Sequence, residues 1–264
     1  MSRVAGIGRI CAAVLAAVVG LAVLTGCGAG DDDDADADDD AGRQLTVFAA
    51  ASLTGAFTEI AAQFEEANPG VDVLVSFDGS AGLVDQIAGG APADVFASAD
   101  EANMDRAVSE GLVASEPALL ATNVLTLITP PHNPAGITGF DTSLLGTRLV
   151  MCAPTVPCGQ AARVLAGSRM LPLEPVSEET SVTDVRGKVA SGEADAGLVY
   201  VTDAAAAGDA VRQIPLEDAE RFPNRYPVAV LEGAADPELA QSFVDVATGP
   251  TGRAVLDSLG FGAP

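Results

Sequence analysis

The chain has 264 residues, with 37 acidic side chains against 13 basic ones, which gives a formal net charge of −24 at pH 7. This balance makes nucleic acids and anionic surfaces poor partners, because like charges repel. Hydrophobic residues make up 48% of the chain, enough for one large domain or two of about 100 residues each.

The first 26 residues are predicted to be a lipoprotein signal peptide. Arg3 and Arg9 give a positive start, and residues 11–24 are all apolar or glycine. That is the length of a signal-peptide core and falls short of the roughly 20 residues that span a bilayer. The core ends in Leu24-Thr25-Gly26-Cys27, which resembles the lipobox of bacterial lipoproteins. The resemblance implies that Cys27 is acylated and anchors the protein outside the cytoplasmic membrane, in the periplasm or on the cell surface. The alternative is a plain signal peptide with an incidental cysteine.

Residues 27–44 are expected to form a disordered tether. Aspartate occupies positions 31–34, 36 and 38–40, and such a run repels itself and buries no apolar surface. A metal-binding acidic tract is the weaker alternative, because the spacing does not match a calcium loop.

Strand and helix signals alternate along the rest of the chain, which predicts an α/β fold with largely parallel strands. The expected strands are 45–49, 71–76, 94–98, 124–129, 149–152, 196–201 and 227–231. The expected helices are 54–67, 81–88, 101–110, 159–166, 184–191 with Thr183 as N-cap, 237–248 and 252–259.

Two junctions between a strand and a helix each carry a serine, Ser52 and Ser80. Hydroxyl groups and free backbone N–H groups at helix starts bind anions well. The two serines are therefore predicted to face one anion, and neither brings a positive charge. The structural alternatives are a helix cap for Ser52 and a turn residue for Ser80.

Two cysteines remain after Cys11 leaves with the signal peptide and Cys27 takes the lipid. Cys152 and Cys158 form an even pair in an exported protein, which favours a disulfide. A redox-active pair is the alternative, although the spacing is not C-x-x-C. An exported hydrolase using Ser52 or Ser80 would depend on His132, the only histidine. Because nucleotide-binding and zinc motifs are also missing from the sequence, we expect a binding protein without cofactor rather than an enzyme.

Several stretches resemble the molybdate-binding proteins of bacterial molybdate ABC importers, in order and spacing along residues 45–262. They are Val47-Phe48-Ala49-Ala50-Ala51-Ser52-Leu53, Ser76-Phe77-Asp78-Gly79-Ser80, Gly90-Ala91-Pro92-Ala93-Asp94-Val95-Phe96-Ala97-Ser98-Ala99-Asp100, Asp184-Val185-Arg186, Gly197-Leu198-Val199-Tyr200 and Tyr226-Pro227-Val228-Ala229-Val230.

The resemblance implies a type II periplasmic-binding-protein fold, with mixed, mostly parallel sheets and a ligand cleft between two lobes. Lobe one would comprise 45–121 plus 226–264, and lobe two 122–225. The ligand would be molybdate, and also tungstate, held by a monomer that delivers it to an ABC importer permease. The family's site maps onto the hydroxyls of Ser52, Ser80 and Tyr200 and the backbone N–H groups of Cys158 and Val185.

Some features of this site stay open at the level of sequence. The family often carries a small residue such as alanine where Cys158 stands; a backbone donor survives that change, whereas the larger thiol would alter the size of the cavity. Arg186 is either a source of local positive field or a solvated helix residue. Sulfate and phosphate are the alternative ligands. Phosphate is less favoured, because a protonated oxyanion requires an acceptor and Asp78 is the only nearby candidate.

Overall fold

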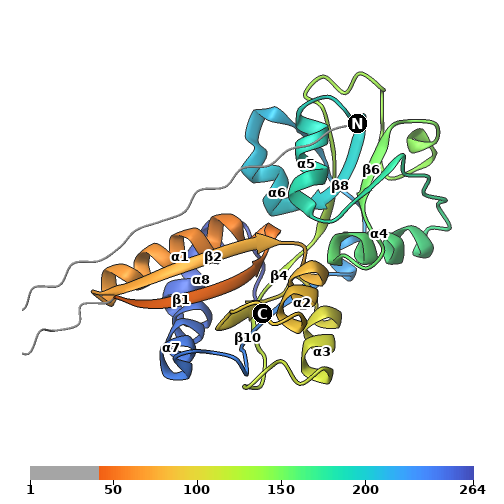
Figure 1. Ribbon diagram of the computed structural model, residues 1–264. Helices are drawn as coiled ribbons and strands as arrows, with labels where there is room; N and C mark the ends of the chain where they lie inside the picture. Colours follow the sequence, from red (N-terminus) through yellow and green to blue (C-terminus); the bar gives the residue numbers. More distant parts are fainter. Residues whose placement is uncertain (1–41) are drawn as a thin grey trace, which may run out of the picture. The chain divides into compact units, whose positions relative to one another are not determined.

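The computed structural model describes residues 42–264, whose helices and strands are shown in Figure 1. Three predictions lie outside the described residues: the signal peptide at 1–26, the lipidated Cys27, and all but the end of the tether at 27–44. Between residues 42 and 264, no helix has both the length and the hydropathy needed to cross a membrane.

One five-stranded sheet, here called the first sheet, has the strand order β2-β1-β3-β10-β4. Its β1 pairs in parallel with β2 and β3, so that Val47 lies opposite both Val75 and Val95. β10 comes from much later in the sequence and runs antiparallel to β3 and β4. The strands are β1 (Arg43–Ala50), β2 (Val71–Asp78), β3 (Val95–Ala97), β4 (Ala118–Asn123) and β10 (Asn224–Val230).

The second sheet has the strand order β7-β6-β8-β5-β9. Within it, β6 runs parallel to β7 and β8, whereas β5 runs antiparallel to β8 and β9. The strands are β5 (Leu125–Thr129), β6 (Leu149–Cys152), β7 (Ser177–Glu179), β8 (Ala196–Tyr200) and β9 (Arg212–Ile214).

Both sheets are mixed, as expected, but parallel pairs do not dominate them. Four of the eight strand pairs are parallel and four are antiparallel. Every antiparallel pair includes β5 or β10. These are the first strands after the chain passes from one sheet to the other, and they arrive without the crossover helix that parallel neighbours require.

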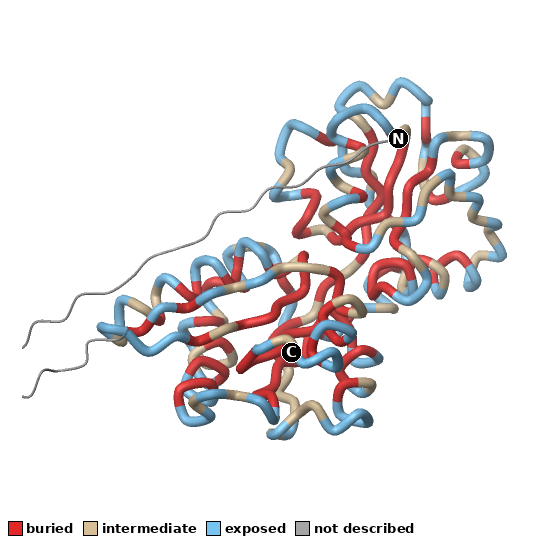
Figure 2. Tube along the Cα trace, viewed as in Figure 1, coloured by how far each residue is buried: buried red, intermediate tan, exposed pale blue. Residues whose placement is uncertain are grey.

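Helices cover both faces of the first sheet. Because side chains alternate along a strand, Val47 and Ala49 of β1 join one apolar cluster and Phe48 joins another. Phe64 meets Phe243 edge to face, with 5.3 Å between ring centroids. The first cluster is covered by α1 (Thr54–Ala67), α7 (Pro237–Thr248) and α8 (Pro250–Ser258), and the other by α2 (Ser80–Ala88) and α3 (Glu101–Ser109). Figure 2 shows the buried strands and the exposed outer faces of these helices.

The second sheet has its own apolar core, in which all five residues of β8 are buried. Its helices are α4 (Pro157–Ser168), α5 (Val182–Ala190) and α6 (Val201–Ala207). Ala51 follows β1 of the first sheet yet belongs to this second core. The cores therefore meet at η1. The short 3-10 helices are η1 (Ala51–Leu53), η2 (Thr142–Leu144), η3 (Gly208–Ala210) and η4 (Ala219–Arg221).

Several sequence predictions differ from the structure in detail. Thr183 was expected to cap the helix after β7, but Ser181 is the N-cap, and its Oγ accepts the Asp184 N–H at 3.2 Å. Ser181 and Thr183 both carry a hydroxyl, and Ser181 is the N-cap because its backbone is extended, as an N-cap residue requires. The sequence reading also missed β4, β7, β9 and α6. Of these, α6 begins directly after Tyr200, where no turn residue marks the change from strand to helix.

Candidate functional site

A small cavity lies where the two sheets' elements meet, with a volume of about 10 Å³. Its walls come from η1 and the start of α2 on one side, and from α4, α5 and the end of β8 on the other. None of the described residues lining it carries a charged side chain. The lining comprises Ala50, Ala51, Ser52, Gly79, Ser80, Ala99, Val156, Pro157, Cys158, Val182 and Tyr200. We call this space the inner cavity.

Ser80 stands at the first position of α2 and is only 1% exposed. Its Oγ accepts the backbone N–H of Ala99 at 3.0 Å. A serine hydroxyl has one hydrogen to donate besides its lone pairs. The bond from Ala99 occupies a lone pair, so the Ser80 hydroxyl keeps its own hydrogen for a ligand in the inner cavity.

Ser52 lies in η1, and its Oγ is 3.0 Å from the Tyr226 hydroxyl oxygen. Tyr226 belongs to β10 and is completely buried, and this burial raises the pKa of its hydroxyl. The phenol therefore stays protonated at neutral pH. If it donates to Ser52, the hydrogen of Ser52 is free to point into the cavity.

Tyr200 ends β8, and its side chain is 1% exposed. Its hydroxyl oxygen is buried and has no hydrogen-bond partner within residues 42–264. The ring meets that of Tyr226 edge to face at 5.9 Å. Burial raises the pKa of the Tyr200 hydroxyl well above its ordinary value of 10.0, so the group is a neutral donor. A buried donor left unpaired costs roughly 1–3 kcal/mol, and such a group calls for an explanation.

Cys158 occupies the second position of α4, which begins at Pro157. A backbone N–H in the first turn of a helix has no acceptor within the helix, so this group is available to the cavity that Cys158 lines. The side chain forms a disulfide with Cys152, the last residue of β6. The disulfide thus ties the start of α4 to the end of its neighbouring strand.

Val185 is placed differently from the other site residues predicted from the sequence. It is fully buried and does not line the inner cavity, whereas Val182, one turn earlier in α5, does. The Val185 N–H is directed at the Ser181 carbonyl oxygen over 3.5 Å, a distance at which a hydrogen bond is weak. Four of the predicted site residues therefore line one cavity: Ser52, Ser80, Cys158 and Tyr200. Val185 does not line it.

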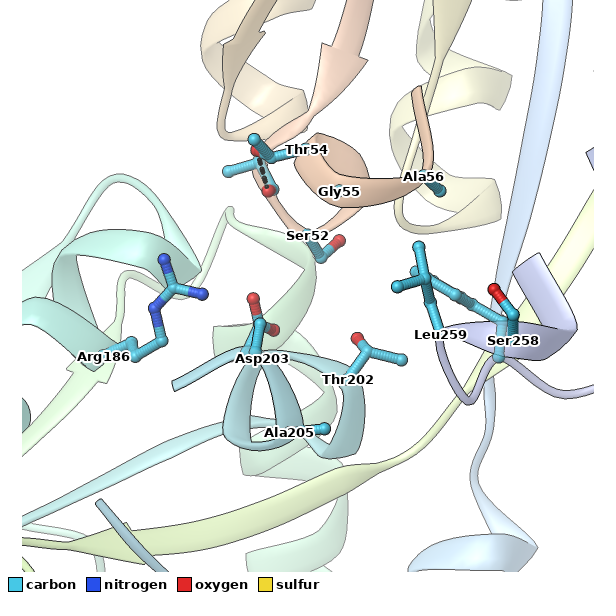
Figure 3. Close-up of a pocket in the computed structure, with 13 residues that line it drawn as sticks. Ser52, Thr54, Gly55, Ala56, Arg186, Thr202, Asp203, Ala205, Ser258 and Leu259 are labelled. Carbon is cyan, nitrogen blue, oxygen red and sulfur yellow. Dashed lines mark hydrogen bonds between the residues drawn. The ribbon is translucent and has the colours of Figure 1, made fainter. Parts of the chain in front are cut away.

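A larger cavity of about 300 Å³ adjoins the inner one, and the two share Ala51 and Ser52. We call it the outer cavity. Figure 3 shows Arg186 and Asp203 facing each other at this cavity, with Ser52 of η1 opposite Asp203 and Thr202 of α6. Asp203 is 3% exposed, and its Oδ2 accepts the Tyr200 N–H at 3.2 Å. Burial raises the pKa of this carboxyl to about 6, although Arg186 and the Tyr200 N–H both act to lower it.

Comparisons of the sequence and of the fold with known proteins both find bacterial solute-binding proteins. Residues 45–262 match the family described as bacterial extracellular solute-binding protein. The molybdate-binding protein ModA of Mycobacterium tuberculosis is 46% identical over 223 residues, which cover 84% of this chain and 85% of that protein. ModA of Escherichia coli is 38% identical, covering 83% and 88% respectively.

This chain belongs to the bacterial extracellular solute-binding protein family. Among solved structures, the Azotobacter vinelandii periplasmic molybdate-binding protein superposes with a TM-score of 0.69 at 24% identity, covering 83% of this chain and 99% of that one. The substrate-binding domain of a putative molybdenum ABC transporter from Clostridium difficile gives 0.62 at 26% identity, with coverage of 84% and 99%. The expected two-sheet α/β fold of a periplasmic binding protein is confirmed.

The structure also places the residues on which the enzymatic alternatives depended. His132 is exposed in the segment after β5 and lines neither the inner nor the outer cavity, so it does not activate Ser52 or Ser80. Both cysteines of the predicted pair are joined in the disulfide. In the part of the chain that the structure describes, no group of three or more His, Cys, Asp or Glu side chains could hold a metal ion.

Sequence reasoning missed three contributors to the site. Tyr226 supports Ser52 from 174 residues away, and only its place in a resembling motif gave a signal. Asp203 supports the Tyr200 backbone from three positions later, a spacing typical of a helix cap. Ala99 anchors Ser80 through a backbone N–H, which no side-chain pattern reveals.

Proposed function

We propose that this protein captures molybdate, and also tungstate, outside the cytoplasmic membrane and delivers it to the permease of an ABC importer. The observation that carries the proposal is the buried hydroxyl of Tyr200, which has no partner among the described residues and lines the same cavity as Ser52 and Ser80. A ligand rich in acceptor oxygens would satisfy that hydroxyl. Catalysis plays no part in this function.

The donor set supports an oxyanion of this kind. Hydroxyls of Ser52, Ser80 and Tyr200 and the backbone N–H of Cys158 are neutral donors around one space. Hydrogen bonds to charged groups each contribute roughly 1.5–3 kcal/mol. Four of them, with Val185 as a fifth after a small shift of α5, would supply on the order of 10 kcal/mol before the costs of closure.

The inner cavity also favours a fully deprotonated oxyanion over a protonated one. A protonated oxyanion needs a carboxylate or another acceptor in its site. Asp78, the candidate from the sequence, does not line this cavity, and its Oδ1 already accepts the Gly79 N–H at 2.7 Å. Molybdate and tungstate are therefore better candidates than hydrogen phosphate.

The relatives support the same ligand. Proteins that bear the name molybdate-binding protein ModA match this chain at 46% and 38% identity over most of their lengths. A solved structure of the tungstate ABC transporter from Geobacter sulfurreducens has a similar fold, with a TM-score of 0.65 at 17% identity. At 17% identity, this likeness shows only that the two folds are similar.

Capture would involve opening and closing of the inner cavity. A volume of about 10 Å³ holds about one water molecule, so a tetrahedral oxyanion needs its walls to part. We place the moving bodies at residues 45–121 plus 226–264 and at 122–225. They would close by a hinge motion about the two chain crossings between the sheets.

The remaining parts of the proposal concern the location of the protein. Acylation of Cys27 would hold the monomer at the membrane, and the acidic segment 27–44 would give it reach toward the permease. A lipid attached through two or more chains anchors stably, whereas a single chain is marginal. Mass spectrometry of the purified mature protein tests this step, since it reports whether the N-terminus is a lipid-modified Cys27.

Calorimetric titration of residues 28–264 with molybdate, tungstate, sulfate and phosphate at equal ionic strength tests the ligand. We expect tight one-to-one binding of molybdate and tungstate, with sulfate far weaker. Binding of sulfate with no heat from molybdate would keep the binding function and overturn the ligand. If none of the four anions gave a heat of binding, the result would contradict the proposed function.

A further inference from the structure

Arg186 is the one cation among the described residues that line the two cavities sharing Ser52. It projects from α5, and its guanidinium points into the outer cavity toward Asp203 (Figure 3). Its side chain is half-buried. Between residues 42 and 264, no carboxylate oxygen lies within ion-pair distance of it.

Asp203 is the only carboxylate among the described residues that line the outer cavity. One of its oxygens already accepts the Tyr200 N–H. Arg186 therefore faces the Asp203 carboxylate, which the backbone of Tyr200 at the end of β8 holds in place. The two charged groups lie farther apart than the 4.0 Å range of an ion pair. The positive charge is balanced at a distance and is not neutralised by contact.

The net negative charge of the protein would hinder the approach of an anion. An oxyanion that approaches a chain of net charge −24 meets an unfavourable long-range field. The inner cavity offers only neutral donors, which act over short distances. A positive group in the outer cavity, which shares Ser52 with the inner cavity, would offset the repulsion where the ion must pass.

We propose that the outer cavity is the approach route of the oxyanion, and that Arg186 is an association residue that attracts the ion there without contacting it in the final bound state. This inference rests on the proposed function. It separates two tasks: Arg186 acts on the association rate, and the neutral donors of the inner cavity hold the ion.

The expected size of the effect follows from Coulomb attraction. In water and without screening by salt, a unit charge acting on a dianion about 9 Å away changes the local ion concentration by about fivefold. Loss of Arg186 should therefore slow association by about fivefold at low salt. The ratio between wild type and variant should shrink toward one as salt rises, because salt screens the interaction.

Stopped-flow fluorescence with the Tyr residues as the probe, at low and high salt, measures association and dissociation of molybdate for wild type, Arg186→Ala and Arg186→Lys. Arg212→Ala is the matched control, because it removes one positive charge from an exposed position on β9. We expect slower association in Arg186→Ala only, with dissociation within twofold of wild type and association restored in Arg186→Lys. Melting temperatures without ligand verify that the variants are folded.

Three results would overturn the inference. Equal association rates in Arg186→Ala and wild type would remove Arg186 from the approach. A change confined to dissociation would make it a contact of the bound ion. Equal slowing in Arg212→Ala would assign the effect to net charge. These outcomes are distinct from failure of the proposed function, in which the wild-type protein itself would not bind molybdate.

Discussion

Gly79 and Thr180 approach each other so closely that a Cβ added to Gly79 would lie 2.0 Å from the Thr180 carbonyl oxygen. Gly79 precedes α2 beside the first sheet, and Thr180 follows β7 of the second. The φ of Gly79 is −63°, which any residue adopts. The glycine is therefore required by the close approach of two parts of the chain, at the rim of the inner cavity that Gly79 lines.

Replacing Gly79 by alanine should hold the cavity open. We expect Gly79→Ala to bind molybdate at least tenfold more weakly, while the melting temperature without ligand changes little, because each sheet keeps its own core. Gly167→Ala is a matched control, since a Cβ there would meet nothing within 4 Å. Calorimetry measures affinity, and small-angle scattering should show no ligand-induced compaction in Gly79→Ala. Equal affinity of both variants would contradict a closure role for this contact.

Tyr200→Phe should affect binding and stability in opposite directions. The variant loses one donor to the anion, which corresponds to about 10- to 100-fold in affinity. It also removes a buried hydroxyl without a partner, so the free energy of unfolding without ligand should stay equal or rise by about 1 kcal/mol. Denaturant unfolding and titration together test this, and a loss of stability would show that the hydroxyl is satisfied.

Ser80→Ala should weaken both properties. Its hydroxyl accepts the Ala99 N–H, so alanine would leave a buried backbone donor unpaired at a cost of about 1–3 kcal/mol. We also expect a loss of affinity similar to that of Tyr200→Phe. The same pair of measurements applies, and unchanged stability with unchanged affinity would remove Ser80 from the site.

Asp203 should make stability depend on pH. Its pKa is about 6 in the folded protein against a reference value of 3.8, so the folded state holds the proton more tightly than the unfolded state. The ionised form is penalised, and the free energy of unfolding should fall as pH rises from about 4 to about 6. Between pH 4 and 7, wild type should lose about 2 kcal/mol relative to Asp203→Asn. Denaturant unfolding across this range measures the difference, with Asp209→Asn, which replaces an exposed aspartate on η3, as the matched control for the loss of one carboxylate.

The disulfide should matter more for stability than for binding. Closing the short loop between Cys152 and Cys158 contributes about 2 kcal/mol in the loop-entropy account. The double variant Cys152→Ala, Cys158→Ala should lose about that much, while the backbone N–H at position 158 remains and affinity falls less than in Tyr200→Phe. Unfolding with and without molybdate measures both quantities. A larger loss of affinity than in Tyr200→Phe would show that the disulfide itself shapes the site.

Local sequence patterns were enough to predict several elements of the fold and two residues of the site. Helix 54–67, strand 149–152 and helix 237–248 have the predicted bounds, because apolar periodicity and end signals are local properties of the chain. The same reasoning placed Ser52 and Ser80 beside helix starts. It could not choose between Thr183 and Ser181 as N-cap, since both residues have the required hydroxyl and only backbone geometry separates them.

How these elements meet could be seen only in the folded protein. Ser52 and Tyr226 are 174 positions apart, and their contact exists because β10 returns beside β3 in the first sheet. The approach of Gly79 to Thr180 and the facing of Arg186 and Asp203 likewise depend on how the elements pack. Such contacts follow from the shape and register of whole sheets, and no periodicity within a short stretch of sequence records them.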